Sequence, residues 1–137
     1  MEKKDIAIQQ LVDGSKLYET GHFVSALTLF GASEEILGKI AKKRTGSNQL
    51  EHEIEYLKTV YKHFNHPCPS NKDLIRQVNK IKNEVKHNDV GENSWVDADF
   101  ESECVFIFMR AVKNYYFAYK EMPQNKKIMQ LFENLAL

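Results

Sequence analysis

A chain of 137 residues is long enough for one domain with a normal hydrophobic core, without metals or crosslinks. Its 42% apolar and 28% charged residues, six glycines and three prolines are typical of a globular helical protein and exclude a disordered or fibrous one. Nineteen basic residues balance nineteen acidic ones, so nucleic acid or an anionic membrane would have to be met by a local patch.

From the apolar runs and the cysteine usage, we expect a cytoplasmic protein without a membrane segment. The first ten residues lack the apolar core of a signal peptide, and the longest apolar run, 104–109, is too short to cross a membrane. Two cysteines, Cys68 and Cys104, do not make a secreted disulfide framework, and the cytosol keeps thiols reduced. Both are expected to be structural.

Helical periodicity of apolar residues begins at the start of the chain. A first helix is predicted to end near Gly21 and a second to cover 23–43, so that a short turn makes them an antiparallel hairpin. The clearest apolar stripe, with steps of three and four residues, predicts a third helix over 49–64, with Leu57 facing the core. The stripe consists of Leu50, Ile54, Leu57, Tyr61 and Phe64.

A Pro-Cys-Pro segment then interrupts the chain. Ser70 with Asp73 forms a start similar to a capping box, and the apolar pattern carries a fourth helix to about His87. After a loop, Asp97 is the expected N-cap of a fifth helix that runs to about Met122. This helix is apolar on nearly every side, which predicts a central position.

Residues after Pro123 predict a last short helix that needs to dock in order to be stable. No glycine-rich or proline-rich linker divides the chain, and no segment recurs at a repeat-like period. The sequence therefore predicts a single all-α domain over residues 1–137. Its expected architecture is an antiparallel up-and-down bundle of four to five helices plus a short C-terminal helix.

Two glycines and two glutamates mark the second helix. Gly31 and Gly38 lie seven residues apart on one face, where they are expected to let another helix approach closely. Between them, Glu34 borders the apolar face, whereas Glu35 is expected to point to water. This arrangement gives little support to a catalytic pair of carboxylates.

Histidines raise the question of a metal site. Glu19 with His22 and Glu84 with His87 match half of a di-iron bundle motif. On a regular helix, however, His87 points away from the apolar stripe. The ligands of a buried di-iron site would have to point toward the core. Two histidines and a cysteine within 63–68 lack the fourth ligand of a structural zinc site. We predict no metal and no cofactor.

The fourth helix is locally basic in a neutral protein, with five cations against Asp73 and Glu84. The cations are Lys72, Arg76, Lys80, Lys82 and Lys86. Four polar residues form a stripe opposite the core: Arg76, Lys80, Asn83 and His87. Such a stripe suits contacts with phosphates or with another subunit. The candidate phosphate ligands are Arg76, Lys80 and Lys86. The alternative is an ordinary solvated face.

Two segments, ALTLFGASEEILGK at 26–39 and KNEVKH at 82–87, resemble the HEPN superfamily of small helical bundles, abortive-infection proteins in particular. NEVKHND and RAVKNYY resemble an uncharacterised bacterial group, and together the similar segments span residues 17–119. The resemblance implies a homodimer that brings two motifs together as a metal-independent ribonuclease, in phage defence or a toxin–antitoxin system. Its implied partners are RNA or a nucleotide, a second copy and an antitoxin-like protein.

The HEPN motif is an arginine, then four to six intervening residues, then a histidine, often with a polar residue directly after the arginine. His87 and Asn83 match it, whereas Lys82 occupies the arginine position. The resemblance implies that His87 transfers protons, that Asn83 orients it or a phosphate, and that Lys82 offers a point charge instead of a bidentate fork. The competing hypothesis is a non-catalytic protein-interaction module in which the motif is a remnant.

Overall fold

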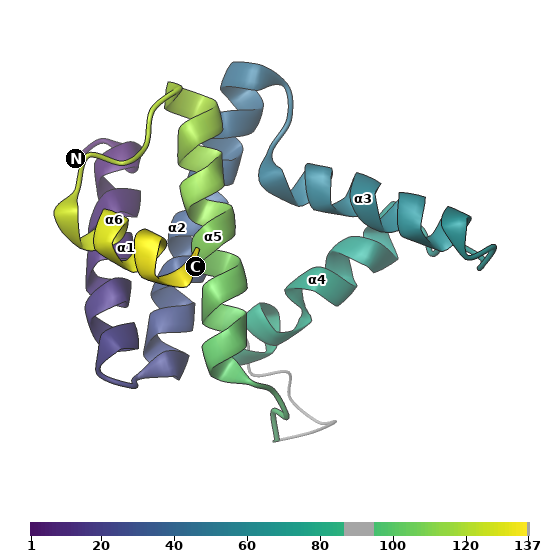
Figure 1. The fold of residues 1–137 in the computed structure, drawn as a ribbon, viewed down its shortest axis with the longest axis horizontal. Helices are drawn as coiled ribbons and strands as arrows, with labels where there is room; N and C mark the ends of the chain where they lie inside the picture. Colours follow the sequence, from purple (N-terminus) through teal and green to yellow (C-terminus); the bar gives the residue numbers. More distant parts are fainter. Residues whose placement is uncertain (87–94, 137) are drawn as a thin grey trace.

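The computed structural model describes residues 1–86 and 95–136. This part of the chain is all-helical, without a β-strand, which confirms the predicted fold class (Figure 1). The helices are α1 (Lys3–Glu19), α2 (Phe23–Thr45), α3 (Gln49–His63), α4 (Asn71–Lys86), α5 (Phe100–Tyr119) and α6 (Lys126–Leu135). Within the described residues, no helix is both long enough and apolar enough to cross a bilayer.

The α1–α2 hairpin forms as predicted. Gly21 has φ 81°, in the left-handed region that glycine enters without steric cost. The amide of His22 donates to the carbonyl of Leu17 at 2.9 Å and closes the end of α1. This short turn reverses the chain so tightly that α1 and α2 pack against each other along their length.

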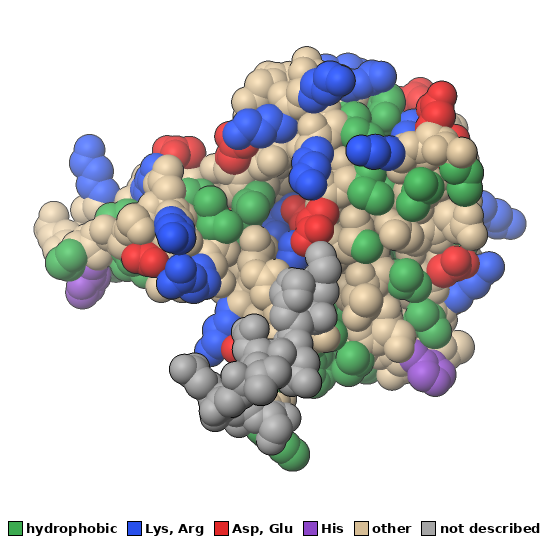
Figure 2. Space-filling model, turned by 180° about the vertical axis from the view of Figure 1, so that it is seen from behind, with side chains coloured by type: hydrophobic (Ala, Val, Ile, Leu, Met, Phe, Trp, Pro, Cys, Tyr) green, Lys and Arg blue, Asp and Glu red, His purple; other side chains and the backbone are tan. Residues whose placement is uncertain are grey.

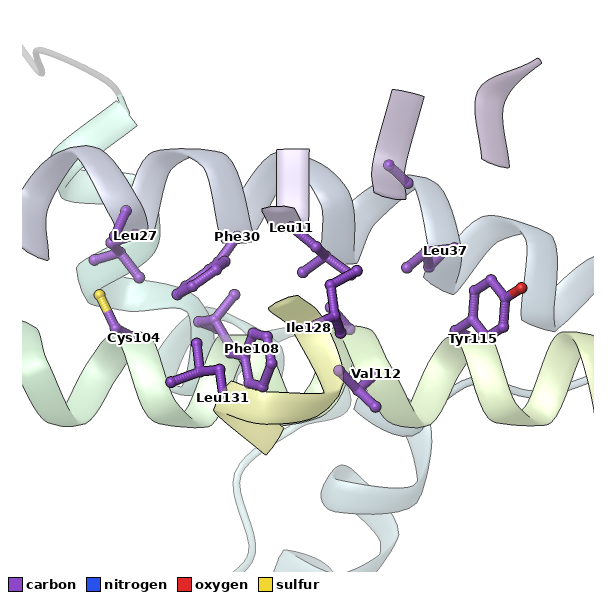
Figure 3. Packing of buried hydrophobic residues seen from close by; sticks show 14 residues of the cluster. Leu11, Leu27, Phe30, Leu37, Cys104, Phe108, Val112, Tyr115, Ile128 and Leu131 are labelled. Carbon is purple, nitrogen blue, oxygen red and sulfur yellow. The ribbon is translucent and has the colours of Figure 1, made fainter. Parts of the chain in front are cut away.

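The hydrophobic core lies between α1, α2 and α5, which stand side by side, with α6 crossing them (Figure 1). Phe30 of α2 and Phe108 of α5 pack at its centre, with ring centroids 5.1 Å apart (Figure 3). α6 buries Ile128 and Leu131 in the same cluster. Its first turn is capped by Asn125, whose Oδ1 accepts from the amide of Ile128 at 3.1 Å. Docking and capping stabilise a helix that is too short to persist alone.

α3 and α4 leave this bundle and form a V-shaped projection, called the arm below (Figure 1). Ile54 near the base of α3 is buried, whereas Leu57 is only half-buried. Farther out, the side chains of Tyr56 and Phe64 are 71% and 64% exposed. The prediction that Leu57 is a core residue is therefore wrong: it is only half-buried and lies outside the core cluster of the bundle.

The helix boundaries differ from the predicted ones at the fifth helix. Asp99, and not Asp97, is the N-cap of α5, and its Oδ1 accepts from the amide of Ser102 at 3.2 Å. The helix ends at Tyr119 because Lys120 takes a left-handed φ of 58°. At α4, Ser70 Oγ accepts from the amide of Asp73 at 3.2 Å, in agreement with the predicted cap.

Candidate functional site

The residues singled out on α4 lie on two different faces. Arg76, Lys80 and Asn83 are exposed, whereas Lys82 is buried and only 6% exposed. The side chain of Lys86, together with all of His87, lies outside the described residues. The structure therefore separates the outer basic stripe from the lysine at the motif's arginine position.

Lys82 points into the base of the arm, where it meets two carboxylates of α2. Its Nζ donates to Glu34 Oε2 at 3.3 Å and to Glu35 Oε1 at 3.1 Å. The side chains of Lys82 and Glu34 are 7% and 6% exposed, so this ion pair is shielded from water. Glu35 does reach water as expected, with its side chain 39% exposed, but it also shares the ammonium group of Lys82 with Glu34, which the sequence did not predict.

The aliphatic stem of Lys82 reaches these carboxylates across Gly31. A Cβ atom at residue 31 would lie 2.9 Å from Lys82 Cδ and 3.0 Å from Cγ, closer than real Cβ contacts allow. The glycine thus allows the close approach of α4 to α2 that its position predicted. A glycine within a helix destabilises it by about 1 kcal/mol relative to alanine. Here the glycine leaves the space through which the side chain of Lys82 reaches the carboxylates.

A second cation, Arg110 of α5, lies at the same junction and holds the arm from the other side. Its Nε and Nη2 donate to Glu53 Oε2 of α3 at 3.1 and 2.7 Å. Its Nη1 donates to Asn79 Oδ1 of α4 at 3.0 Å and lies 3.8 Å from Glu34 Oε1. One guanidinium therefore connects α5 with α2 and with both helices of the arm.

Five charged side chains make up this junction cluster: Glu34, Glu35, Glu53, Lys82 and Arg110. Figure 2 shows acidic side chains at the centre of the face where the arm meets the bundle, with Lys and Arg side chains around them. Charges removed from water must be paired and hydrogen-bonded to be tolerated. The cluster fixes the angle of the arm, and its cations are engaged with carboxylates.

Asn114 adds a polar contact beside this cluster and anchors the start of α3. Its Oδ1 accepts from the backbone amide of Gln49 at 2.8 Å, so a side chain of α5 caps a donor at the beginning of α3. A Cβ at Gly38 would lie 3.3 Å from Asn114 Nδ2, so the second glycine of α2 makes room for this amide. The two glycines therefore face two different helices.

The structural importance of Arg110 and Asn114 is not evident from apolar periodicity. Both lie within or next to the most apolar segment of the chain and both are buried, at 3% and 0% exposure. The available signal is the presence of an arginine and an asparagine four residues apart, in RAVKN, directly after the longest apolar run. Buried polar residues of this kind need partners from other helices.

The outer face of α4 is the more accessible part of the candidate site. Arg76 lies 3.7 Å from Asp73 Oδ1 in an exposed pair, which is a weak interaction in water. Within the described part of the chain, Lys80 has no ion pair. Arg76, Lys80 and Asn83 follow one another at steps of four and three residues and so lie along one side of the helix.

A crevice of about 270 Å³ lies between the arm and α5. Its wall combines apolar side chains such as Val78 and Phe106 with the carboxylates of Glu53 and Glu103 and the guanidinium of Arg110. Burial raises the pKa of the Glu103 carboxyl, which Arg110 opposes and Asp99 reinforces. Phe106 is 62% exposed at the edge of this crevice.

Metal ligands do not assemble among the described residues: no group of three or more His, Cys, Asp and Glu side chains there is arranged to hold an ion. Cys68 is exposed and Cys104 is buried, and both are free thiols. Cys104 Sγ donates to the carbonyl of Phe23 at 3.1 Å, and burial raises the pKa of this thiol to about 12. Cys104 is therefore a packing residue of the core, because a buried thiol that stays protonated does not act as a nucleophile.

The chain was compared with known protein families, curated proteins and solved structures. No model of a known protein family matches the chain, and neither a curated protein nor a solved structure is significantly similar to it.

Proposed function

We propose that this chain is a HEPN-like helical domain that binds RNA through the outer face of α4. The observation that carries the proposal is the exposed row of Arg76, Lys80 and Asn83 along one side of α4. Two cations and an amide at this spacing reach successive phosphates, and such contacts supply most of the affinity of non-specific RNA binding. Lys86 and His87 continue the row in sequence.

Cleavage is the second part of the proposal, and it depends on His87. An imidazole transfers protons near neutral pH, and Asn83 precedes His87 by four residues in the sequence. Lys82 acts differently from the family's arginine, because Glu34 and Glu35 hold its ammonium group. For Lys82 to contact a scissile phosphate, both ion pairs would have to break. We therefore assign Lys82 a supporting role and leave proton transfer to His87.

A homodimer is part of the same proposal, since two copies of the α4 face would form one composite site. Light scattering at micromolar concentration measures the mass directly. A mass of two chains is expected, and a strictly monomeric mass would remove the composite-site model.

Binding and cleavage are tested separately on the same RNA. Arg76→Glu with Lys80→Glu should weaken RNA binding about tenfold or more and flatten its salt dependence, while Lys113→Glu, an exposed change on α5, should not. Cleavage is compared among wild type, His87→Ala and Lys82→Arg with chelator present, because a metal-independent nuclease survives chelation. Loss of cleavage in His87→Ala with intact folding supports the catalytic role.

The alternative function is a non-catalytic protein-interaction module. The specific observation in its favour is that Lys82 is fully engaged in the junction cluster, where it holds the arm. If wild type and Lys82→Arg both bind RNA but leave it intact, the binding half of the proposal stands and the catalytic half fails. If neither protein binds RNA, the interaction module is the better account.

A further inference from the structure

A groove on the side of the bundle away from α6 has features that RNA binding does not use. α1 and α2 enclose about 550 Å³ of open space between them. Its floor is aliphatic and consists of half-buried side chains, Ile6 from α1 with Ala32, Ile36 and Ile40 from α2. Figure 2 shows this face, with apolar side chains lying beside Lys and Arg side chains.

The rims of the groove carry positive charge. Lys39 and Lys43 follow one another on α2, Lys3 faces them from α1, and all three are exposed. Within the described residues, none of the three has an ion pair. The acidic member of the lining, Glu35, is held by Lys82 at the lower end. In a chain of zero net charge, this groove is a local concentration of unpaired cations.

The basic character continues past the end of the groove. A second hollow shares Lys3, Ile40 and Lys43 with it and adds Lys4, Arg44 and Tyr119, with Glu2 as the acidic residue of its lining. There the guanidinium of Arg44 lies over the ring of Tyr119, 4.4 Å from its centroid, and Lys4 Nζ lies 5.2 Å from the same centroid. The ring holds both cations near the groove's end.

From these features we propose that the α1–α2 groove binds an amphipathic helix of a protein partner, with carboxylates flanking its apolar stripe. Ala32, Ile36 and Ile40 are spaced by four residues and span about 12 Å, which matches roughly two turns of a docked helix. α6 already covers another side of the three-helix core, and a docked helix would complete the bundle on the side that α1 and α2 leave open.

The chemistry of the floor selects this occupant over others. A phosphate backbone would meet the lysines but leave four aliphatic side chains in contact with charged oxygens, and the floor has no aromatic ring for base stacking. A lipid surface is met by projecting apolar and aromatic side chains, whereas these lie in a concave groove. An amphipathic helix with acidic flanks can place its apolar stripe on the aliphatic floor and its carboxylates beside the lysines of the rims.

The test uses a labelled helical peptide of about 18 residues with a leucine stripe flanked by glutamates, and a second peptide in which lysines replace the glutamates. Fluorescence anisotropy with the full chain measures binding of each. The acidic peptide is expected to bind, and the basic peptide is not. Lys39→Glu with Lys43→Glu should weaken binding at least tenfold, and Ile36→Gln should weaken it as well.

Lys113→Glu on α5 is the matched control and should leave peptide affinity unchanged, with circular dichroism verifying the fold of each variant. Failure of the acidic peptide to bind, or equal binding by the Lys39→Glu, Lys43→Glu protein, overturns the proposal. It is also overturned if that variant loses RNA or anionic-vesicle binding or homodimer mass while its peptide affinity is unchanged. Those outcomes assign the groove to nucleic acid, lipid or a second copy.

Discussion

The ammonium group of Lys82 lies 3.3 Å from a carboxylate oxygen of Glu34, although the two residues are 48 positions apart in the sequence. Both side chains are almost completely buried. A motif position that the resemblance assigns to phosphate chemistry is thus part of the connection between α4 and α2. This position therefore affects stability as well as any activity, and the two effects have to be measured separately.

Replacing the buried lysine should be strongly destabilising. Lys82→Met removes the charge while keeping the aliphatic stem, and it leaves Glu34 and Glu35 without their shared cation. We expect a loss of about 3 kcal/mol in the free energy of unfolding, measured by urea titration. Lys80→Met, an exposed change two residues away, should stay within about 0.5 kcal/mol. Equal stability of the two variants would contradict a buried ion pair.

Gly31→Ala tests the close approach of α4 to α2 directly. Alanine is the better helix former by about 1 kcal/mol, so at an open site the change would be stabilising. Here the new methyl group would meet the stem of Lys82 at 2.9 Å, and the ion pairs at its end restrict how far the stem can move. Thermal denaturation should therefore show a lower Tm. An increase would mean that α4 packs farther from α2.

Much of the fold follows from the sequence, because apolar periodicity and capping residues act locally. The stripe from Leu50 to Phe64 predicts α3 to within one residue at its end, and Ser70 marks the start of α4. The direction of the arm does not follow. A stripe shows that a helix has an apolar side, but it does not specify which helix covers that side. The sequence therefore places Leu57 in the core, whereas the structure leaves it half-buried.

The candidate site was predictable only in part. The outward position of Arg76, Lys80 and Asn83 follows from helical phase, and the structure agrees. The pairing of Lys82 with Glu34, and of Arg110 with Glu53, joins residues 48 and 57 positions apart. Such pairs depend on tertiary packing, and no spacing rule along the chain encodes them.

Within α3, the cost of shortening an apolar side chain should depend on its distance from the bundle. Ile54 is 4% exposed, whereas Leu57 is half-buried. Ile54→Ala should cost about 3 kcal/mol and Leu57→Ala about 1 kcal/mol, as measured by denaturant titration. If Leu57→Ala cost as much as Ile54→Ala, the arm would pack more closely on the bundle than the structure shows.

The two thiols should differ sharply in reactivity. Burial raises the pKa of Cys104 to about 12, so at about pH 8 it is neutral as well as shielded, whereas Cys68 is exposed. Iodoacetamide should add one group to the native protein and two in denaturant, as counted by intact mass. The Cys68→Ser protein should remain unmodified when folded. Rapid labelling of that variant would indicate opening of the core near Phe23.

The raised pKa of the Glu103 carboxyl predicts that the stability of the fold depends on pH through this group. Its pKa is raised above the ordinary 4.5, chiefly by burial, so the folded state binds a proton more tightly than the unfolded state does. The resulting stability is fully present below the unfolded pKa and is lost as the pH rises through the folded pKa. Above that point the carboxylate costs stability.

Glu103→Gln imitates the protonated form at every pH, so it removes this dependence. Urea titrations should find the variant more stable than wild type at about pH 7.5, and the difference should disappear as the pH falls below the unfolded pKa, where Glu103 is protonated in both states. Glu133→Gln, an exposed change on α6, is the control and should not show this difference. A variant that is less stable at neutral pH would show that the attraction of Arg110 for the carboxylate outweighs the burial of Glu103.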